Sequence, residues 1–265
     1  MLPIYRIHYI CFQIYFVIAT DKLHIDKLKD NFKDKETFSV NDVVRFYMKD
    51  EPQIKITTVN WRIYNLVQRG ILDRIGRGKL ALGKGRKYLP EISAKLKSIY
   101  SKLKKEFPFL EICIWNTSSL NEFMVHQPGR FFILIEVEKE ATQSVFFFLK
   151  TAKYPVLVEP TNEIIEKYLS EDKENIIIKS LVSEAPVQVI SGLKTVTIEK
   201  MLVDIFCDET VFSAQQGYEK RTIFVEAMNK YSVNENRMLR YADRRRKKES
   251  FHDYLNSISK LRQQS

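Results

Sequence analysis

Basic, polar and aromatic side chains gather between Thr57 and Lys87, and their types suit contacts with nucleic acid. From Gln53 to Tyr88 the chain has nine Lys or Arg and one Asp. Cationic side chains neutralise the phosphates of duplex DNA, while amide, guanidinium and apolar groups can reach base edges in the major groove. We expect base contacts from Asn60, Trp61, Arg62 and Asn65, backbone or minor-groove contacts from Arg77, Lys79, Lys84, Arg86 and Lys87, and further contacts from Thr57 and Thr58.

Two cofactor motifs nearly match in the same stretch. Gly76, Gly78 and Ala81 satisfy GxGxxA, and Gly78 with Gly83 and Lys84 satisfies most of a P-loop. The P-loop fails one residue after Lys84, where Ser or Thr should bind magnesium. Neither match lies between a strand and a long helix, as phosphate binding requires. We therefore interpret these glycines as turn residues of a hairpin and expect no cofactor.

Carboxylates are the candidates for catalysis in the C-terminal half of the chain. Glu136 and Glu138 alternate on a predicted strand, so they would share one face that could hold a metal ion. The ExK pattern of restriction-type nucleases is missing, because the residue two positions after Glu136 is Glu138 and not a lysine. Asp204 shares a predicted helix face with Lys200 and Asp208, which indicates a solvated stripe of ion pairs. CxxC and HExxH are absent as well, and we expect no catalytic residue and no metal site.

A helix followed by a hairpin must position the basic residues. Val59, Ile63, Leu66 and Val67 recur at helical spacing and would face a core. Thr57 or Thr58 can cap the start of this helix, and Gly70 can take the left-handed conformation at its end. Residues 71–75 and 79–82 then alternate like strands. Shorter helices are expected over residues 21–32 and 40–48, the second capped by Ser39. Together these elements predict a winged helix-turn-helix over residues 21–90.

Strands and helices alternate after this region, which indicates a sheet covered by helices. A charged helix over residues 91–107 is expected to link two domains. Strands are expected at 109–115, 131–137, 154–158, 176–181 and 186–190, with helices at 118–126, 140–152 and 161–170 between them, and four helices at the end. The predicted fold class is mixed α/β: an N-terminal winged helix-turn-helix, and an α/β domain with a helical end over residues 108–265.

The distribution of charge and the number of cysteines limit the kinds of partner and the cellular compartment that we expect. The net charge is +10, yet residues 106–209 contain 17 Asp or Glu against nine Lys or Arg, so different parts should have different partners. The three cysteines, Cys11, Cys113 and Cys207, are far apart and imply free thiols in a reducing compartment. Residues 1–20 form an apolar leader, which is short for a membrane span and has no clear signal-peptide pattern. A strand, an interaction segment or an upstream start codon are the alternatives for it.

Several stretches of the C-terminal half resemble a known family. They are Trp115 with Ser118–Pro128, Phe132–Lys139, Ile198–Asp204 and Tyr231–Arg245. With the predicted winged helix, they resemble the abortive-infection AbiEi-like antitoxins of type IV toxin–antitoxin systems, over residues 21–258. The resemblance implies a cytoplasmic DNA-binding transcription regulator that is not an enzyme. It also implies two partners, the double-stranded DNA of its own promoter and a cognate toxin of the nucleotidyltransferase type.

Two other readings of the sequence stay open. The predicted winged helix could target a nucleic-acid-processing enzyme, such as a nuclease or a nucleotidyltransferase-like protein, or it could serve only as a protein-interaction module. A homodimer also stays open, because the sequence fixes neither the oligomeric state nor the operator.

Overall fold

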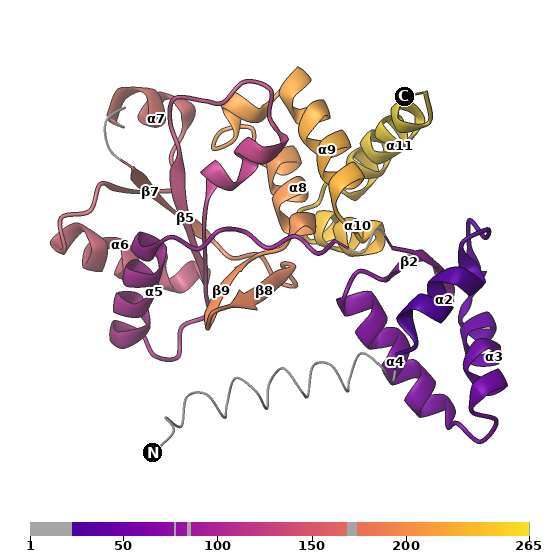
Figure 1. Cartoon of the computed structure of the whole chain (residues 1–265). Coiled ribbons are helices and arrows are strands. Elements are labelled where there is room, and N and C mark those ends of the chain that lie inside the picture. Colours follow the sequence, from indigo (N-terminus) through magenta and orange to yellow (C-terminus); the bar gives the residue numbers. More distant parts are fainter. Residues whose placement is uncertain (1–22, 77, 84–85, 169–173, 265) are drawn as a thin grey trace, which may run out of the picture. The chain divides into compact units, whose positions relative to one another are not determined.

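The computed structural model describes residues 23–76, 78–83, 86–168 and 174–264. The chain forms two compact units, and the boundary between them lies between Lys87 and Tyr88 (Figure 1). Arg77, Lys84 and the leader before Leu23 lie outside the described residues, as does Cys11. The first unit has one apolar core, and the second unit has two, one on each face of its main sheet.

The first unit has the element order helix, strand, helix, helix, strand, strand. Its elements are α2 (Ile25–Phe32), β1 (Phe38–Ser39), α3 (Val40–Asp50), α4 (Ile56–Gln68), β2 (Leu72–Gly76) and β3 (Lys79–Leu82). The three strands form one antiparallel sheet in the order β1-β3-β2. The core joins apolar faces of all six elements, with Phe32, Tyr47 and Ile63 among its largest fully buried side chains.

Local signals set the ends of these elements. Ser39 caps α3 as expected, in a capping box that it forms with Asp42. Gly70 has the expected left-handed backbone, with φ 67°, directly after the last turn of α4. The expected threonine cap of α4 is wrong, because the helix begins at Ile56 and its N-cap residue is Lys55. β1 was missed, since two residues carry no periodic signal.

The second unit contains a four-stranded sheet. Its strands are β4 (Ile112–Asn116), β5 (Phe132–Val137), β7 (Asn175–Ser180) and β6 (Val156–Val158), in this spatial order. β5, β7 and β6 run parallel, and β4 is antiparallel to β5. Successive residues of β5 enter two different cores, with Ile133 and Ile135 in one and Phe132 and Leu134 in the other. This alternation follows from the two-residue period of a strand.

Helices cover both faces of this sheet, so the predicted mixed α/β class is confirmed (Figure 1). One face packs on α5 (Ala94–Glu106) and α6 (Thr142–Thr151), and the other packs on α8 (Ile198–Cys207) and the helices after it. Those helices are α9 (Tyr218–Lys230), α10 (Glu235–Arg244) and α11 (Lys248–Gln264), and α7 (Asn162–Tyr168) lies between β6 and β7. α5, which we expected to link two domains, packs into the core of the second unit through Leu96, Ile99 and Leu103.

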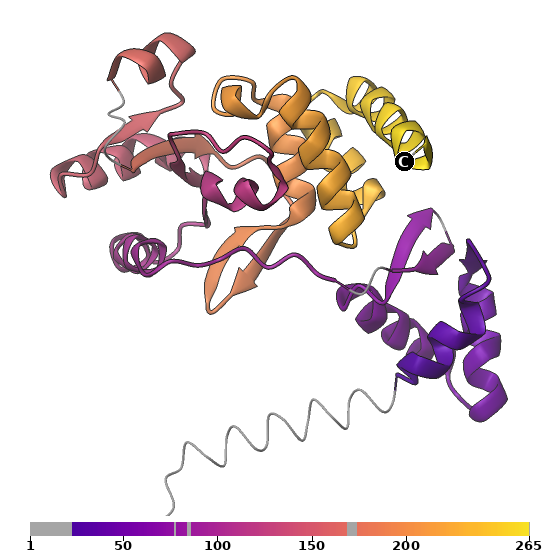
Figure 2. The ribbon, with the colours of Figure 1, turned by 45° about the horizontal axis from the view of Figure 1, so that its top comes forward.

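A hairpin of β8 (Val187–Ile190) and β9 (Leu193–Val196) forms a separate two-stranded ribbon in the second unit (Figure 2). Short 3-10 helices occur at Thr117–Phe123, Lys139–Ala141 and Ser213–Gln215. Across the described part of the chain, no helix combines the length and the apolar character that crossing a membrane would require.

Candidate nucleic-acid interface

α4 divides into a buried face and an exposed face. Val59, Ile63 and Leu66 are fully buried in the core of the first unit, as their spacing predicts. The opposite face exposes Thr57 and Asn60 together with Trp61 and Tyr64, whose residues are 53% and 58% exposed. These four positions follow the i, i+3, i+4, i+7 pattern of one helix face. Thr58 is also exposed, in the first turn.

Tyr64 was missing from the expected contacts, although its spacing from Thr57 and Trp61 could have identified it. It lies seven residues after Thr57 and three after Trp61, so it falls on their side of the helix. Asn65 is half-buried, and its side-chain amide donates a 2.8 Å hydrogen bond to the carbonyl of Trp61. Tyr64 therefore belongs to the exposed face, whereas the amide of Asn65 is used within the helix.

Arg62 does not face outward, which corrects the expected base contact. Its residue is only 6% exposed, and its guanidinium donates two hydrogen bonds to Glu51, of 2.7 and 3.1 Å. The guanidinium carbon also lies 4.6 Å from the ring centroid of Tyr47. Glu51 follows the last residue of α3, so Arg62 joins the end of α3 to α4. These hydrogen bonds from Arg62 lower the pKa of the Glu51 carboxyl below its ordinary value.

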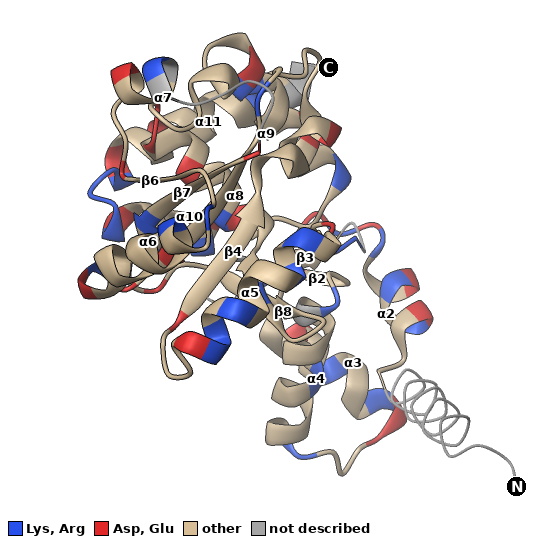
Figure 3. Ribbon diagram, turned by 90° about the vertical axis from the view of Figure 1, so that its left-hand side faces the viewer, with Lys and Arg blue, Asp and Glu red and all other residues tan. Residues whose placement is uncertain are grey.

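The start of α4 is open to an anionic partner. Lys55, its N-cap residue, makes no side-chain cap, and the first turn contains no acidic residue. Unpaired backbone N–H groups and the helix dipole favour negative charge at such an end. α4 contains no Asp or Glu at any position (Figure 3). The exposed face of α4 therefore carries no group that would repel a phosphate.

The hairpin adds cationic side chains that the structure exposes. Lys79, at the start of β3, is exposed, and Arg86 and Lys87 are exposed after the hairpin. Gly78 occupies the hairpin turn with φ 71°, a conformation that favours glycine. At Gly83 a side chain would overlap the carbonyl oxygen of Gly70. The turn at Gly78 and this close approach at Gly83 explain two of the glycines that mimic a phosphate-binding motif.

The carboxylates of the second unit are arranged differently from the expectation. Glu138 lies beyond β5 and is exposed, so it does not share a strand face with Glu136. Lys200 and Asp204, expected on a solvated stripe, are buried in α8, and Lys200 is fully inaccessible. The Lys200 ammonium lies 2.7 Å from Oε1 of Glu136 and hydrogen-bonds Asp204. Asp204 also accepts hydrogen bonds from Tyr241 and Arg245.

Two carboxylates and two cations thus compensate one another inside the second unit. Burial lowers the pKa of Lys200, but the facing carboxylates of Asp204 and Glu136 more than reverse this effect, so the pKa lies well above its ordinary value. Burial raises the pKa of Glu136, which Lys200 opposes. This ionic network holds β5, α8 and the end of α10 together, and it leaves Glu136 closed to a substrate.

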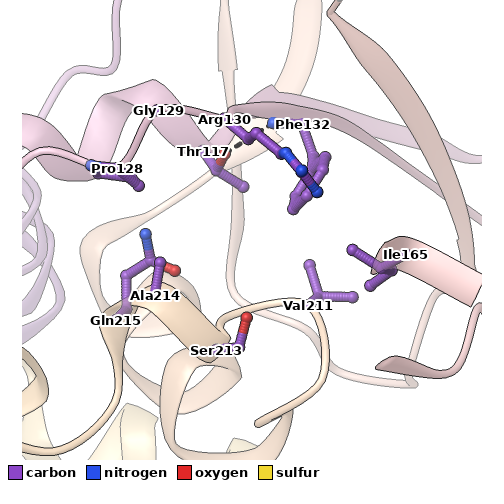
Figure 4. A pocket seen from close by; sticks show the side chains of 10 residues that line it. All are labelled: Thr117, Pro128, Gly129, Arg130, Phe132, Ile165, Val211, Ser213, Ala214 and Gln215. Carbon is purple, nitrogen blue, oxygen red and sulfur yellow. Dashed lines mark hydrogen bonds between the residues drawn. The ribbon is translucent and has the colours of Figure 1, made fainter. Parts of the chain in front are cut away.

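A cavity of about 240 Å³ lies at another place in the second unit. The side chains of Arg130, Ile165, Val211 and Gln215 face the same space from three segments of the chain (Figure 4). The hydroxyl of Thr117, at its edge, accepts a 2.9 Å hydrogen bond from the backbone N–H of Phe132. Among the described residues that line this cavity there is no carboxylate, histidine or cysteine. Within the described residues, no three His, Cys, Asp or Glu side chains are grouped for a metal ion.

These features define a two-unit α/β protein whose first unit presents one helix face beside a basic hairpin. Residues 58–261, more than half of the chain, match the model of a family of unknown function, DUF6577, and the chain belongs to this family. The match begins in α4 and ends in α11. A comparison with curated proteins gave no match.

Proposed function

We propose that the first unit is a winged helix-turn-helix that binds duplex DNA, with α4 in the major groove. The observation that carries this proposal is the exposed face of α4, which has no acidic residue and begins at an uncapped helix N-terminus. The exposed cations Lys79, Arg86 and Lys87 supply contacts to phosphates beside it. The order of helices and strands in this unit matches the helix, turn, helix and wing of such regulators.

The resemblance to AbiEi-like antitoxins supports a role for this binding. In the proposed role, the protein represses its own operon as a transcription regulator, and its second unit binds a toxin of the nucleotidyltransferase type. The proposal places the protein in the cytoplasm, where the free thiols of Cys113 and Cys207 would stay reduced.

Binding of the full chain to its own promoter fragment tests the proposal. In fluorescence anisotropy, affinity should fall steeply with salt, because each phosphate contact contributes about 0.9 to the slope of log K against log salt. Replacing both Lys79 and Lys87 by Ala should weaken binding to all sequences and reduce this slope by about two. Asn60→Ala should instead reduce the preference for the promoter over unrelated DNA.

Replacing a lysine outside the proposed interface separates a specific interface from general electrostatic attraction. Lys105, exposed on α5 in the second unit, lies outside the proposed interface. Lys105→Ala should leave the salt slope unchanged. The proposal is wrong if the promoter fragment does not bind, or if the Lys79 and Lys87 variant binds it as the unchanged chain does.

A further inference from the structure

The exposed face of α4 differs in chemistry from the rest of the predominantly basic region around it. Two of its large side chains are aromatic and well exposed, Trp61 at 53% and Tyr64 at 58%. Large apolar groups are usually buried, and a cluster of them on one helix face marks a contact surface. The same face also carries Asn60, an exposed residue one position before Trp61.

The same face lacks the group that most often recognises guanine. Arginine or lysine usually donates to O6 and N7 of guanine. Arg62 is the only Lys or Arg between Ile56 and Gln68, and its guanidinium is buried against Glu51 and Tyr47. Lys55 precedes the helix, at an uncapped N-terminus where contact with a phosphate is favoured. The central turns of α4 therefore present no exposed cation to a base edge.

The groups that remain match the major-groove edge of an A·T base pair. An amide such as that of Asn60 can pair with N6 and N7 of adenine, and apolar side chains contact the C5-methyl group of thymine. Trp61 and Tyr64 can each cover such a methyl group, and so can the methyl of Thr57. We propose that α4 reads A·T-rich DNA by burying thymine methyl groups against Trp61 and Tyr64. This inference rests on the proposed function, because it requires α4 to enter the major groove.

Replacement of thymine by deoxyuridine isolates the proposed contact. Deoxyuridine lacks only the C5-methyl group and keeps the base pairing and the backbone charge. The probes are three labelled duplexes of 24 base pairs, which therefore carry the same backbone charge. They are an A·T-rich duplex, the same duplex with uracil in place of thymine, and a G·C-rich duplex. Anisotropy of the full chain at one fixed salt concentration gives the three dissociation constants.

We expect the thymine duplex to bind more tightly than both others. Each methyl group buried by the protein should contribute about fourfold in affinity, from about 0.8 kcal/mol per buried carbon group. Two such contacts would give a ratio of about fifteen between the thymine and uracil duplexes. In a chain with Trp61→Ala and Tyr64→Ala, this ratio should fall towards one. Both positions are exposed, so these substitutions should leave the melting temperature of the first unit nearly unchanged.

The matched control is Lys79→Ala, which removes a proposed phosphate contact. It should weaken binding to the thymine and uracil duplexes by the same factor. Equal binding of these two duplexes by the unchanged chain would overturn the inference and leave the proposed function intact. An unaltered ratio in the Trp61 and Tyr64 variant would also overturn it, because it would show that other residues contact the methyl groups. If none of the duplexes binds in a salt-dependent manner, the proposed function fails with it.

Discussion

Replacing Lys200 by Met should destabilise the second unit strongly. The Lys200 ammonium is fully buried between Glu136 and Asp204, and Arg245 hydrogen-bonds Asp204 but makes no such bond to Glu136. Loss of Lys200 would therefore leave the Glu136 carboxylate buried without a cation beside it. Removing one partner of a buried ion pair costs about 3–5 kcal/mol. We expect a loss of that size near neutral pH, which is a large fraction of the stability of a domain.

The distribution of tryptophans provides a measurement for this unit alone. The chain has two tryptophans, Trp61 in the first unit and the buried Trp115 in the second. Trp115 stacks on Phe212 at a centroid distance of 5.8 Å, so its fluorescence reports the packing of the second core. In a Trp61→Phe background, urea unfolding followed by fluorescence gives the free energy of unfolding with and without Lys200→Met.

A double-mutant cycle with Glu136→Gln tests the cause of the loss. The chain that carries both changes has no stranded carboxylate at residue 136, so its loss should be at least 1 kcal/mol smaller than the sum of the two single losses. The loss for Lys200→Met alone should shrink at lower pH. Without Lys200, the pKa of Glu136 would rise further in the folded state, so the protonated form regains stability as the pH falls.

Lys194→Met is the control, because Lys194 pairs with Glu111 at the surface and should cost at most about 1 kcal/mol. Equal losses for Lys200→Met and Lys194→Met would refute the reasoning. An additive cycle would refute it too, since it would show that Lys200 and Glu136 do not interact.

Three further predictions concern the first unit. Arg62→Ala should lower the free energy of unfolding of the first unit by about 1–3 kcal/mol. Arg62→Lys should not restore this stability, because a lysine cannot form the two parallel hydrogen bonds to Glu51. Circular dichroism during urea unfolding measures the stability of each variant. Gly83→Ala should destabilise the hairpin through its overlap with Gly70, so that the unit melts at a lower temperature, and an unchanged melting temperature would contradict this close approach. Hydrogen bonds from Ser39 lower the pKa of Asp42, and hydrogen bonds from Arg62 lower the pKa of Glu51. The two carboxylates therefore contribute fully to the stability of the folded unit above about pH 4.5, and this contribution is lost as the pH falls further. Melting temperatures measured between pH 3 and 6 should show this loss, and the loss should be smaller in Glu51→Gln.

The sequence was most informative where the signal is local. Ser39 lies three residues before Asp42, which is enough to identify a capping box, and Gly70 follows an amphipathic run that must stop. The hairpin and most strands of the second unit were predicted because alternation and turn residues lie within a few positions. β9 was missed, since its four residues follow β8 after a turn of only two residues and carry no separate boundary signal.

The orientation of charged residues was not predictable in the same way. Lys200 and Asp204 have the i, i+4 spacing of a surface ion pair, and this spacing is the same whether the helix is exposed or buried. Their partner Glu136 is 64 residues away in the sequence. One signal was present: the apolar residues of α8, among them Ile198 and Met201, cover most of the helix circumference, which is typical of a buried helix. Similarly, the residues of α4 do not show that Arg62 turns towards Glu51.

The ionic network also has a consequence for the order in which the chain folds. The ribosome adds Glu136, Lys200 and Asp204 to the chain before Arg245, which is the second cation of the ionic network. During synthesis, a chain that ends before residue 245 has two acidic groups and one basic group in this network, because Arg245 is not yet present. The first unit needs no residue beyond Lys87 for its own core. We therefore expect the first unit to fold on the ribosome before the last helices of the second unit have been synthesised.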